Sequence, residues 1–255
     1  MSPSRKVVRM CRMVGVVFKG EFPVETLVDL QHVAEIGKVP EEEVDGHMDG
    51  WGIVSFMNRS PKLVGKSERP AYLDPSYDSA LRTVPELESP NILIAHVRRA
   101  SRGDTSLRNT HPFICENIVF AHNGTVDGLR SDTTRTPKGE TDSERLSMLL
   151  ADKFDETGDL ESALKRLIKE DIRTKETYTA MMLVSDGKRL FGFRGFTRQD
   201  REWYYKLKVA RCRDYVAVFQ ESINEADILG AVSELENGEL VSVGLELDVK
   251  REMVR

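Results

Sequence analysis

Short runs of apolar and β-branched residues, each of strand length, recur along this 255-residue chain and constrain its fold more than any other feature. Each run is bounded by Gly, Pro, Asp or Asn, which commonly end strands. The pattern predicts at least seven strands. Their sequences are CRMVGVVF, GWGIVSFM, NILIAHV, NIVFAHN, YTAMMLV, KRLFGFR and YVAVFQ.

Helical periodicity lies between these groups of strands. Apolar residues recur at helical spacing in the segments 24–36, 79–84, 143–154 and 160–172. Thr141 followed by Glu144 has the spacing of a capping box, which predicts a helix over 141–154 with Asp142 in its first turn. The segment 124–138 is polar and rich in turn residues, so we expect a mobile loop there.

Groups of strands with intervening helices indicate an α+β fold with two stacked sheets and helices outside. Periodicity alone does not distinguish this sandwich from a single covered sheet. The chain is long enough for one large domain, and 40% of its residues are hydrophobic. Since no repeat or long linker divides it, one domain is the simpler interpretation.

Composition excludes several classes of function. A net charge of -5 gives no field that would attract nucleic acid. No apolar run is long enough to span a membrane, and the first ten residues lack the apolar core of a secretory signal, so we expect a cytoplasmic protein. Cys11, Cys115 and Cys212 are widely spaced, which argues against a disulfide framework and a structural zinc site. The spacing of potential ligands therefore suggests no metal site.

Cys11 follows Met10 and opens the first strand-like run. By default such a cysteine is a core residue. It can also be a nucleophile whose own α-amine acts as general base, provided that it is the first residue of the mature chain. Translation from Met10 followed by removal of the methionine, or cleavage of a propeptide, would create that terminus.

Polar residues at the ends of other runs supply further candidates. Asn123 and Gly124 could form an oxyanion hole, although the Asn-Gly dipeptide alone favours a hairpin turn. Strand alternation puts His96 and Arg98 on one face and Arg99 on the other. An inward guanidinium could hold a carboxylate, although adjacent arginines are more often solvated.

Three weaker candidates have equally good structural explanations. Asp142 at a helix start could bind an ammonium group, but such residues usually only stabilise the helix. Trp51 lies in a DGWG turn that permits close backbone approach, and a core tryptophan explains it equally well. His111 lies in an extended segment before a proline.

Taken in order, Cys11 and the motifs DGWG, AHVRRAS, NTHPF, AHNGT and TDSE resemble the class II glutamine amidotransferases, N-terminal-nucleophile hydrolases whose mature chains begin with cysteine. The small stand-alone members are the most similar. The resemblance runs to about Leu150 and is looser from 151 to 255. It implies a four-layer αββα sandwich of two antiparallel sheets between helix layers. Residues 11–255 would form a single glutamine amidotransferase domain, and residues 1–10 an extension from a mis-assigned start or a propeptide.

The resemblance also implies catalytic roles. Cys11 would attack the side-chain amide carbon of glutamine and form a glutamyl thioester. Asn123 and Gly124 would donate hydrogen bonds to the tetrahedral oxyanion. Cys115 and Cys212 match no catalytic position.

Substrate binding is assigned in the same way. Arg98 would hold the substrate α-carboxylate and Asp142 its α-ammonium group. Trp51 and His111 would be scaffold or pocket-wall residues without a role in proton transfer. The proposed chemistry requires no metal and no organic cofactor.

The leading hypothesis is an amidohydrolase that releases glutamate and ammonia from glutamine, with the ammonia passing to an unidentified acceptor or a partner synthase. A γ-glutamyl peptide or conjugate hydrolase would use the same site. If Cys11 is not freed, the chain would be a non-catalytic glutamine-binding protein. The candidate partners are glutamine or a γ-glutamyl compound, a synthase subunit and a second copy of the chain, but neither nucleic acid nor a membrane.

Overall fold

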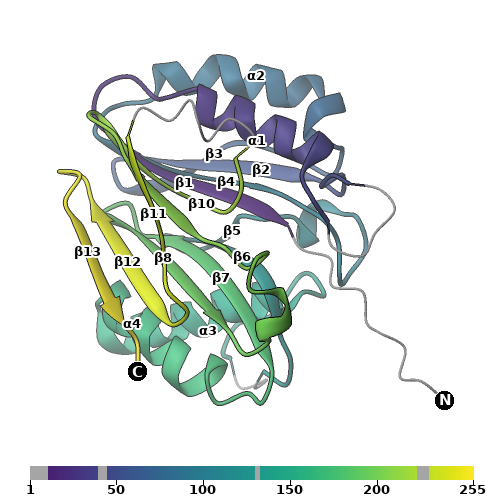
Figure 1. Cartoon of the computed structure of the whole chain (residues 1–255), viewed down its shortest axis with the longest axis vertical. Coiled ribbons are helices and arrows are strands. Elements are labelled where there is room, and N and C mark those ends of the chain that lie inside the picture. Colours follow the sequence, from purple (N-terminus) through teal and green to yellow (C-terminus); the bar gives the residue numbers. More distant parts are fainter. Residues whose placement is uncertain (1–10, 40–44, 130–132, 223–229) are drawn as a thin grey trace.

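Two stacked antiparallel sheets lie between two layers of helices in the computed structural model of the chain (Figure 1). The structure describes residues 11–39, 45–129, 133–222 and 230–255. One outer layer consists of α1 (Glu25–Ile36) and α2 (Pro75–Thr83), and the other of α3 (Asp142–Thr157) and α4 (Leu160–Leu167). The α+β class and the four-layer sandwich are thereby confirmed.

The first sheet, sheet A, contains seven strands. From edge to edge they are β11 (Ala231–Glu234), β9 (Lys208–Arg211), β10 (Tyr215–Phe219), β1 (Arg12–Phe18), β4 (Asn91–Val97), β2 (Trp51–Met57) and β3 (Ser60–Ser67). The central strand β1 pairs with β10 and β4. Because Arg12 is opposite Val97, Cys11 lies where β4 has just ended, beside Arg98 and Arg99.

The second sheet, sheet B, contains six strands. In order they are β13 (Val249–Met253), β12 (Glu239–Gly244), β8 (Arg189–Phe196), β7 (Tyr178–Ser185), β6 (Ile118–Val126) and β5 (Phe113–Cys115). Asn123 and Gly124 lie inside β6, opposite Met181 and Ala180 of β7. The hairpin turn favoured by the Asn-Gly dipeptide is therefore wrong, because the strand continues through both residues.

The expected elements are present. All seven apolar runs form strands, and all four periodic segments form helices, the last of which continues beyond α4 into a π-helical turn over Ile168–Ile172. Thr141 caps α3 by accepting a hydrogen bond from the backbone N–H of Glu144 at 3.1 Å. The loop expected over 124–138 starts later, because β6 extends to Val126, and residues 130–132 lie outside the described residues.

Alternation along the strands decides which side chains reach the space between the sheets. Ile94 of sheet A and Ala121 of sheet B belong to the central apolar layer. His96 lies two residues after Ile94 in β4, and Asn123 lies two residues after Ala121 in β6, so both side chains are on the inward face, at its polar end.

No helix in the described part of the chain is long and apolar enough to cross a membrane.

Trp51 points the other way. Its fully buried ring packs edge-to-face on Tyr77 of α2 with the ring centroids 4.8 Å apart. Its Nε1 donates a hydrogen bond to the Asp74 carboxylate at 3.1 Å. Because alternation in β2 directs this side chain to the outer helix layer, Trp51 is a scaffold residue, and its alternative placement in the pocket wall is wrong.

The central layer should carry most of the stability of the sandwich. Leu183 is fully buried between the sheets, whereas Leu63 on β3 is 53% exposed. Replacing Leu183→Ala should lower the free energy of unfolding by about 2–5 kcal/mol, because the buried methyl groups leave a cavity. The matched control Leu63→Ala should change it by roughly 0.5 kcal/mol or less. Urea denaturation of both variants measures the difference, and equal losses would contradict this assignment of the core.

Candidate active site

A pocket opens where Cys11, the segment after β4, the end of β6 and the start of α3 meet. Its walls come from Cys11, Arg98, Arg99, Ser101, Arg102, His111, His122, Asn123, Gly124, Thr141, Asp142 and Ser143. Every residue expected to be catalytic or substrate-binding lies in this set, as does His111. Trp51 is the one expected site residue that the structure places elsewhere.

Asn123 holds Cys11 by its main chain. The backbone N–H of Cys11 donates to Asn123 Oδ1 at 2.9 Å. Asn123 Nδ2 donates to the Cys11 carbonyl oxygen and, at 2.8 Å, to Gln220 Oε1. A side-chain amide has only two N–H groups, and both are used here. Asn123 can therefore donate to an oxyanion only if one of these bonds is released.

The thiol of Cys11 lies against the backbone of Arg99. The Arg99 N–H donates to Sγ at 3.2 Å, and Sγ lies 3.5 Å from the Arg99 carbonyl oxygen. Burial raises the pKa of Cys11 to about 11, although the Arg99 N–H and the nearby Arg98 charge act in the opposite direction. The thiol is consequently protonated at neutral pH, and its attack on a substrate needs a base.

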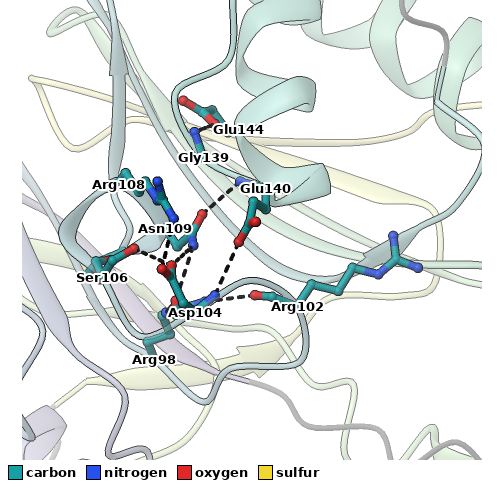
Figure 2. Close-up of polar contacts among 10 residues, drawn as sticks. Arg98, Arg102, Asp104, Ser106, Arg108, Asn109, Gly139, Glu140 and Glu144 are labelled. Carbon is teal, nitrogen blue, oxygen red and sulfur yellow. Dashed lines mark hydrogen bonds and ion pairs between the residues drawn. The ribbon is translucent and has the colours of Figure 1, made fainter.

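Arg98 is the deeply buried arginine of the pair, and Arg99 is only half-buried. The guanidinium of Arg98 donates to two backbone carbonyls, those of Asp104 at 2.8 Å and Arg102 at 2.9 Å (Figure 2). It therefore shapes the loop after β4 while lining the pocket.

A polar network joins this loop to the segment before α3 (Figure 2). The carboxylate of Asp104 accepts a hydrogen bond from Asn109 Nδ2 at 2.6 Å, and Asn109 Oδ1 accepts from the backbone N–H of Glu140 at 2.9 Å. Glu144, in the first turn of α3, accepts from the backbone N–H of Gly139 at 2.7 Å. These hydrogen bonds thus fix the position of the loop after β4 relative to the start of α3.

The DGWG turn supports the same loop from the opposite direction. Asp49 accepts a hydrogen bond from the Ala100 N–H at 2.7 Å, and the Arg98 N–H donates to the Gly50 carbonyl at 2.8 Å. A Cβ on Gly52 would lie 2.3 Å from the carbonyl oxygen of His111. The close backbone approach expected of this turn is confirmed at Gly52.

Gly124 and Asp142 both line the pocket near the end of β6. Gly124 has a φ of +149°, and a Cβ there would lie 2.0 Å from the Thr179 carbonyl oxygen, so only glycine fits. Asp142 Oδ2 accepts a hydrogen bond from the Val126 N–H at 2.8 Å. The carboxylate of Asp142 therefore fixes the first turn of α3 on β6 and places a negative charge in the pocket wall.

Sequence reasoning missed His122 and Ser143, although both belong to motifs that it selected. His122 Nε2 is 3.2 Å from the Thr179 carbonyl, and Nδ1 is 2.9 Å from Ser143 Oγ. Since a carbonyl only accepts, we assign the ring proton to Nε2 and a hydrogen bond from the Ser143 hydroxyl to Nδ1. Burial lowers the pKa of His122, with Asp142 opposing the shift, so the ring is neutral at pH 7.

His111, which lines the pocket, stacks on His96. Their ring centroids are 4.3 Å apart, and both rings are buried. Burial lowers both pKa values well below that of a free histidine. His111 lines the pocket, and the neutral ring of His96 packs on it. Among the described residues no group of His, Cys, Asp or Glu is placed to hold a metal ion, and neither Cys115 nor Cys212 lines the pocket.

Comparison with known proteins finds similarity over most of the chain. The family model of the class-II glutamine amidotransferases matches residues 10–214. A "putative glutamine amidotransferase" of Haemophilus influenzae is 32% identical over 62% of this chain and 51% of its own length. Another protein of that description, from Escherichia coli, is 31% identical over 58% of this chain and 60% of its own length. This chain thus matches little more than half the length of either relative.

Solved structures share the fold at lower identity. A glutamine aminotransferase class-II domain protein from Silicibacter pomeroyi superimposes with a TM-score of 0.58 at 19% identity, covering 94% of this chain and 98% of the other. An allosteric regulatory enzyme of purine biosynthesis gives a TM-score of 0.68 at 16% identity, covering 96% of this chain and 49% of its own. The family match extends over most of the sandwich and all the pocket residues, and on that ground this chain belongs to the class-II glutamine amidotransferases.

Proposed function

We propose that this chain hydrolyses the side-chain amide of glutamine through a thioester on Cys11 and releases glutamate and ammonia. The observation that carries the proposal is the convergence in one pocket of a thiol, an amide beside a glycine, a guanidinium and a carboxylate. Thiol and amide suit acyl transfer. The two opposite charges suit the α-carboxylate and α-ammonium groups of glutamine.

The base in this proposal is the α-amine of Cys11. Attached to Met10, the Cys11 nitrogen is an amide and cannot accept a proton; at a free terminus it is an amine whose ordinary pKa is about 8. The proposal therefore includes a mature chain that starts at Cys11. The family match supports it, because it begins only one residue earlier. The bond from this nitrogen to Asn123 Oδ1 would orient the amine.

The reaction then follows in two stages. As Sγ bonds to the amide carbon of glutamine, the α-amine takes the thiol proton, and the amide oxygen becomes an oxyanion. The amine next passes the proton to the leaving nitrogen, the C–N bond breaks, and ammonia departs. Water, deprotonated by the same amine, attacks the thioester, and glutamate leaves as the thiol is restored.

The oxyanion needs donors that are in place as its charge develops, and each is worth about 3 kcal/mol of the barrier. In our proposal Asn123 supplies one of them by releasing its bond to Gln220, and it keeps the bond that holds Cys11 in place. Gly124 provides the space that lets the substrate oxygen approach the backbone.

Arg98 can donate hydrogen bonds to the substrate while it keeps those to the loop after β4. A guanidinium has five N–H donors, and the backbone carbonyls of Asp104 and Arg102 take two of them. The remaining donors are enough for a carboxylate. With the α-ammonium beside Asp142, the site would require both free α-substituents of a γ-glutamyl group.

The contacts proposed above recognise the γ-glutamyl part of the substrate and do not involve the leaving group on its γ-carbonyl. A γ-glutamyl peptide or conjugate hydrolase would use the same residues and is the alternative function.

We place the activity in the cytoplasm, with the ammonia passing to an unidentified acceptor or a partner synthase. If Cys11 keeps its extension, the alternative is a glutamine-binding protein without turnover.

The role of Cys11 can be tested against a second cysteine. Cys11→Ala should abolish ammonia release from glutamine because it removes the only thiol in the pocket, while calorimetry should still detect glutamine binding. Cys212→Ala, outside the pocket, should keep the parent rate. Hydrolysis by the Cys11→Ala variant at the parent rate would show that the nucleophile lies elsewhere.

The pH dependence should report the amine. The base must be unprotonated, so kcat/KM should fall as pH drops through about 8 and level off above it. The pKa of the Cys11 thiol, raised to about 11, lies above this range. A profile without an inflection near 8 that rises until pH 11 would instead identify a preformed thiolate as the reacting form.

Parallel assays with glutamine and γ-glutamyl dipeptides separate the two enzymatic functions. For a glutaminase we expect ammonia from glutamine and no amino acid release from the dipeptides. Faster cleavage of the dipeptides would favour the conjugate hydrolase. Blocking the substrate α-carboxylate as an amide should raise KM in either case, because Arg98 then loses its anionic partner.

A further inference from the structure

Strand β13 forms an outer edge of sheet B (Figure 1). Among the described strands it pairs only with β12, in a regular antiparallel register in which Val241 faces Arg251. The strands β12, β8 and β7 separate it from β6, and none of its residues lines the candidate active site. A strand in this position has a row of backbone N–H and C=O groups that the edge strand of another chain can bind.

The hydrogen bonds at the two ends of this pairing show which backbone groups face outward. The Gly244 N–H of β12 donates to the Asp248 carbonyl at 3.0 Å, and the Val254 N–H donates at 3.0 Å to the carbonyl opposite it. Hydrogen-bonded pairs recur at every second residue of an antiparallel ladder, so the backbone groups of Lys250 and Glu252 also point to β12. The outward row therefore comes from Val249, Arg251 and Met253.

The side chains of β13 alternate between two faces of the sheet. On the face that α4 covers, Glu252 forms an ion pair with Lys165 at 2.6 Å, and the exposed Lys250 lies two residues earlier. On the other face Arg251 binds both carboxylate oxygens of Glu239, at 2.6 and 2.7 Å. The charge of Arg251 is thus neutralised within the chain, whereas Lys250 and Glu252 form a pair of opposite charges along the edge.

A second copy of the chain can pair with this edge about a twofold axis. When Arg251 faces its own copy, Val249 faces Met253, and the two outward rows form hydrogen-bonded pairs throughout. Lys250 of each chain then faces Glu252 of the other in a non-hydrogen-bonded pair, where facing side chains lie closest. These opposite charges favour the register.

The same charges oppose the neighbouring registers. A shift by two residues is the smallest that keeps the hydrogen-bonding rows aligned. In one direction it would place Lys250 opposite Lys250, and in the other Glu252 opposite Glu252. Like charges directly opposite each other are unfavourable, so the charge pattern of β13 selects one register.

We infer that two copies of this chain associate through β13, with Arg251 on the twofold axis, and join their B sheets into one continuous sheet. Val249 and Met253, the latter 43% exposed, supply apolar contact. Since an edge of five residues buries less area than a standard interface, we expect a weak dimer with a Kd of about 10 µM. The candidate active sites stay open because β13 is not part of them.

Sedimentation equilibrium and amide hydrogen exchange of the full chain test this inference without any measurement of hydrolysis, so the outcome does not depend on the proposed function. The average mass should rise from monomer to dimer with concentration. Over the same range, exchange should slow at the amides of Val249, Arg251 and Met253, which gain partners. The amides of Lys250 and Glu252, already bonded to β12, should change little.

Charge reversal tests the register. Lys250→Glu and Glu252→Lys should each weaken the dimer at least about tenfold, because each places like charges opposite each other twice across the axis. An equimolar mixture of the two variants should dimerise as the parent does, because every facing pair is then again of opposite charge. Lys62→Glu, at an exposed position on β3, is the matched control and should leave the dimer unchanged.

Loss of the dimer in each single variant and its recovery in the mixture support the inference. It is overturned if the chain stays monomeric at ten times the expected Kd, if the outward amides of β13 exchange equally fast at all concentrations, or if Lys250→Glu and Lys62→Glu dimerise equally well.

Discussion

The hydrogen bonds between Asn123 and the main chain of Cys11 are the contact on which the rest of the site depends. They join residues 112 positions apart and link the start of the central strand of sheet A to β6 of sheet B. The polar end of the space between the sheets is therefore closed by one amide that satisfies both backbone groups of the candidate nucleophile. Within this contact both backbone groups of Cys11 and both ends of the Asn123 amide have partners, which favours a single arrangement.

The layered fold makes this contact possible. Alternation sends aliphatic side chains of both sheets into a common core, and the same faces become polar where β4 and β6 end. Glycine is needed at Gly124 because the backbone of β7 lies against β6 there. The shape of the pocket thus depends on the close packing of the β6 and β7 backbones at Gly124. Its chemistry comes from a small number of polar side chains.

Much of this arrangement could be predicted from the sequence, and the failures have physical causes. The seven strands with the clearest apolar runs were found, and the other strands were missed. Among the missed strands, β11 and β13 expose mostly polar side chains at the sheet edges. Trp51 was misplaced because a turn motif does not reveal which face of β2 a side chain occupies. Gln220 was missed because its partner Asn123 lies 97 residues away, and only the folded sheets bring the two together.

The central claim is that the amine of Cys11 itself acts as the base, and one comparison tests it most directly. Two forms of the chain, one beginning at Cys11 and one retaining residues 1–10, would be verified by intact mass spectrometry and assayed for ammonia release from glutamine. The account predicts turnover by the form that begins at Cys11 and a rate lower by roughly 100-fold or more in the extended form, the usual contribution of a general base. Equal rates in the two forms would contradict it.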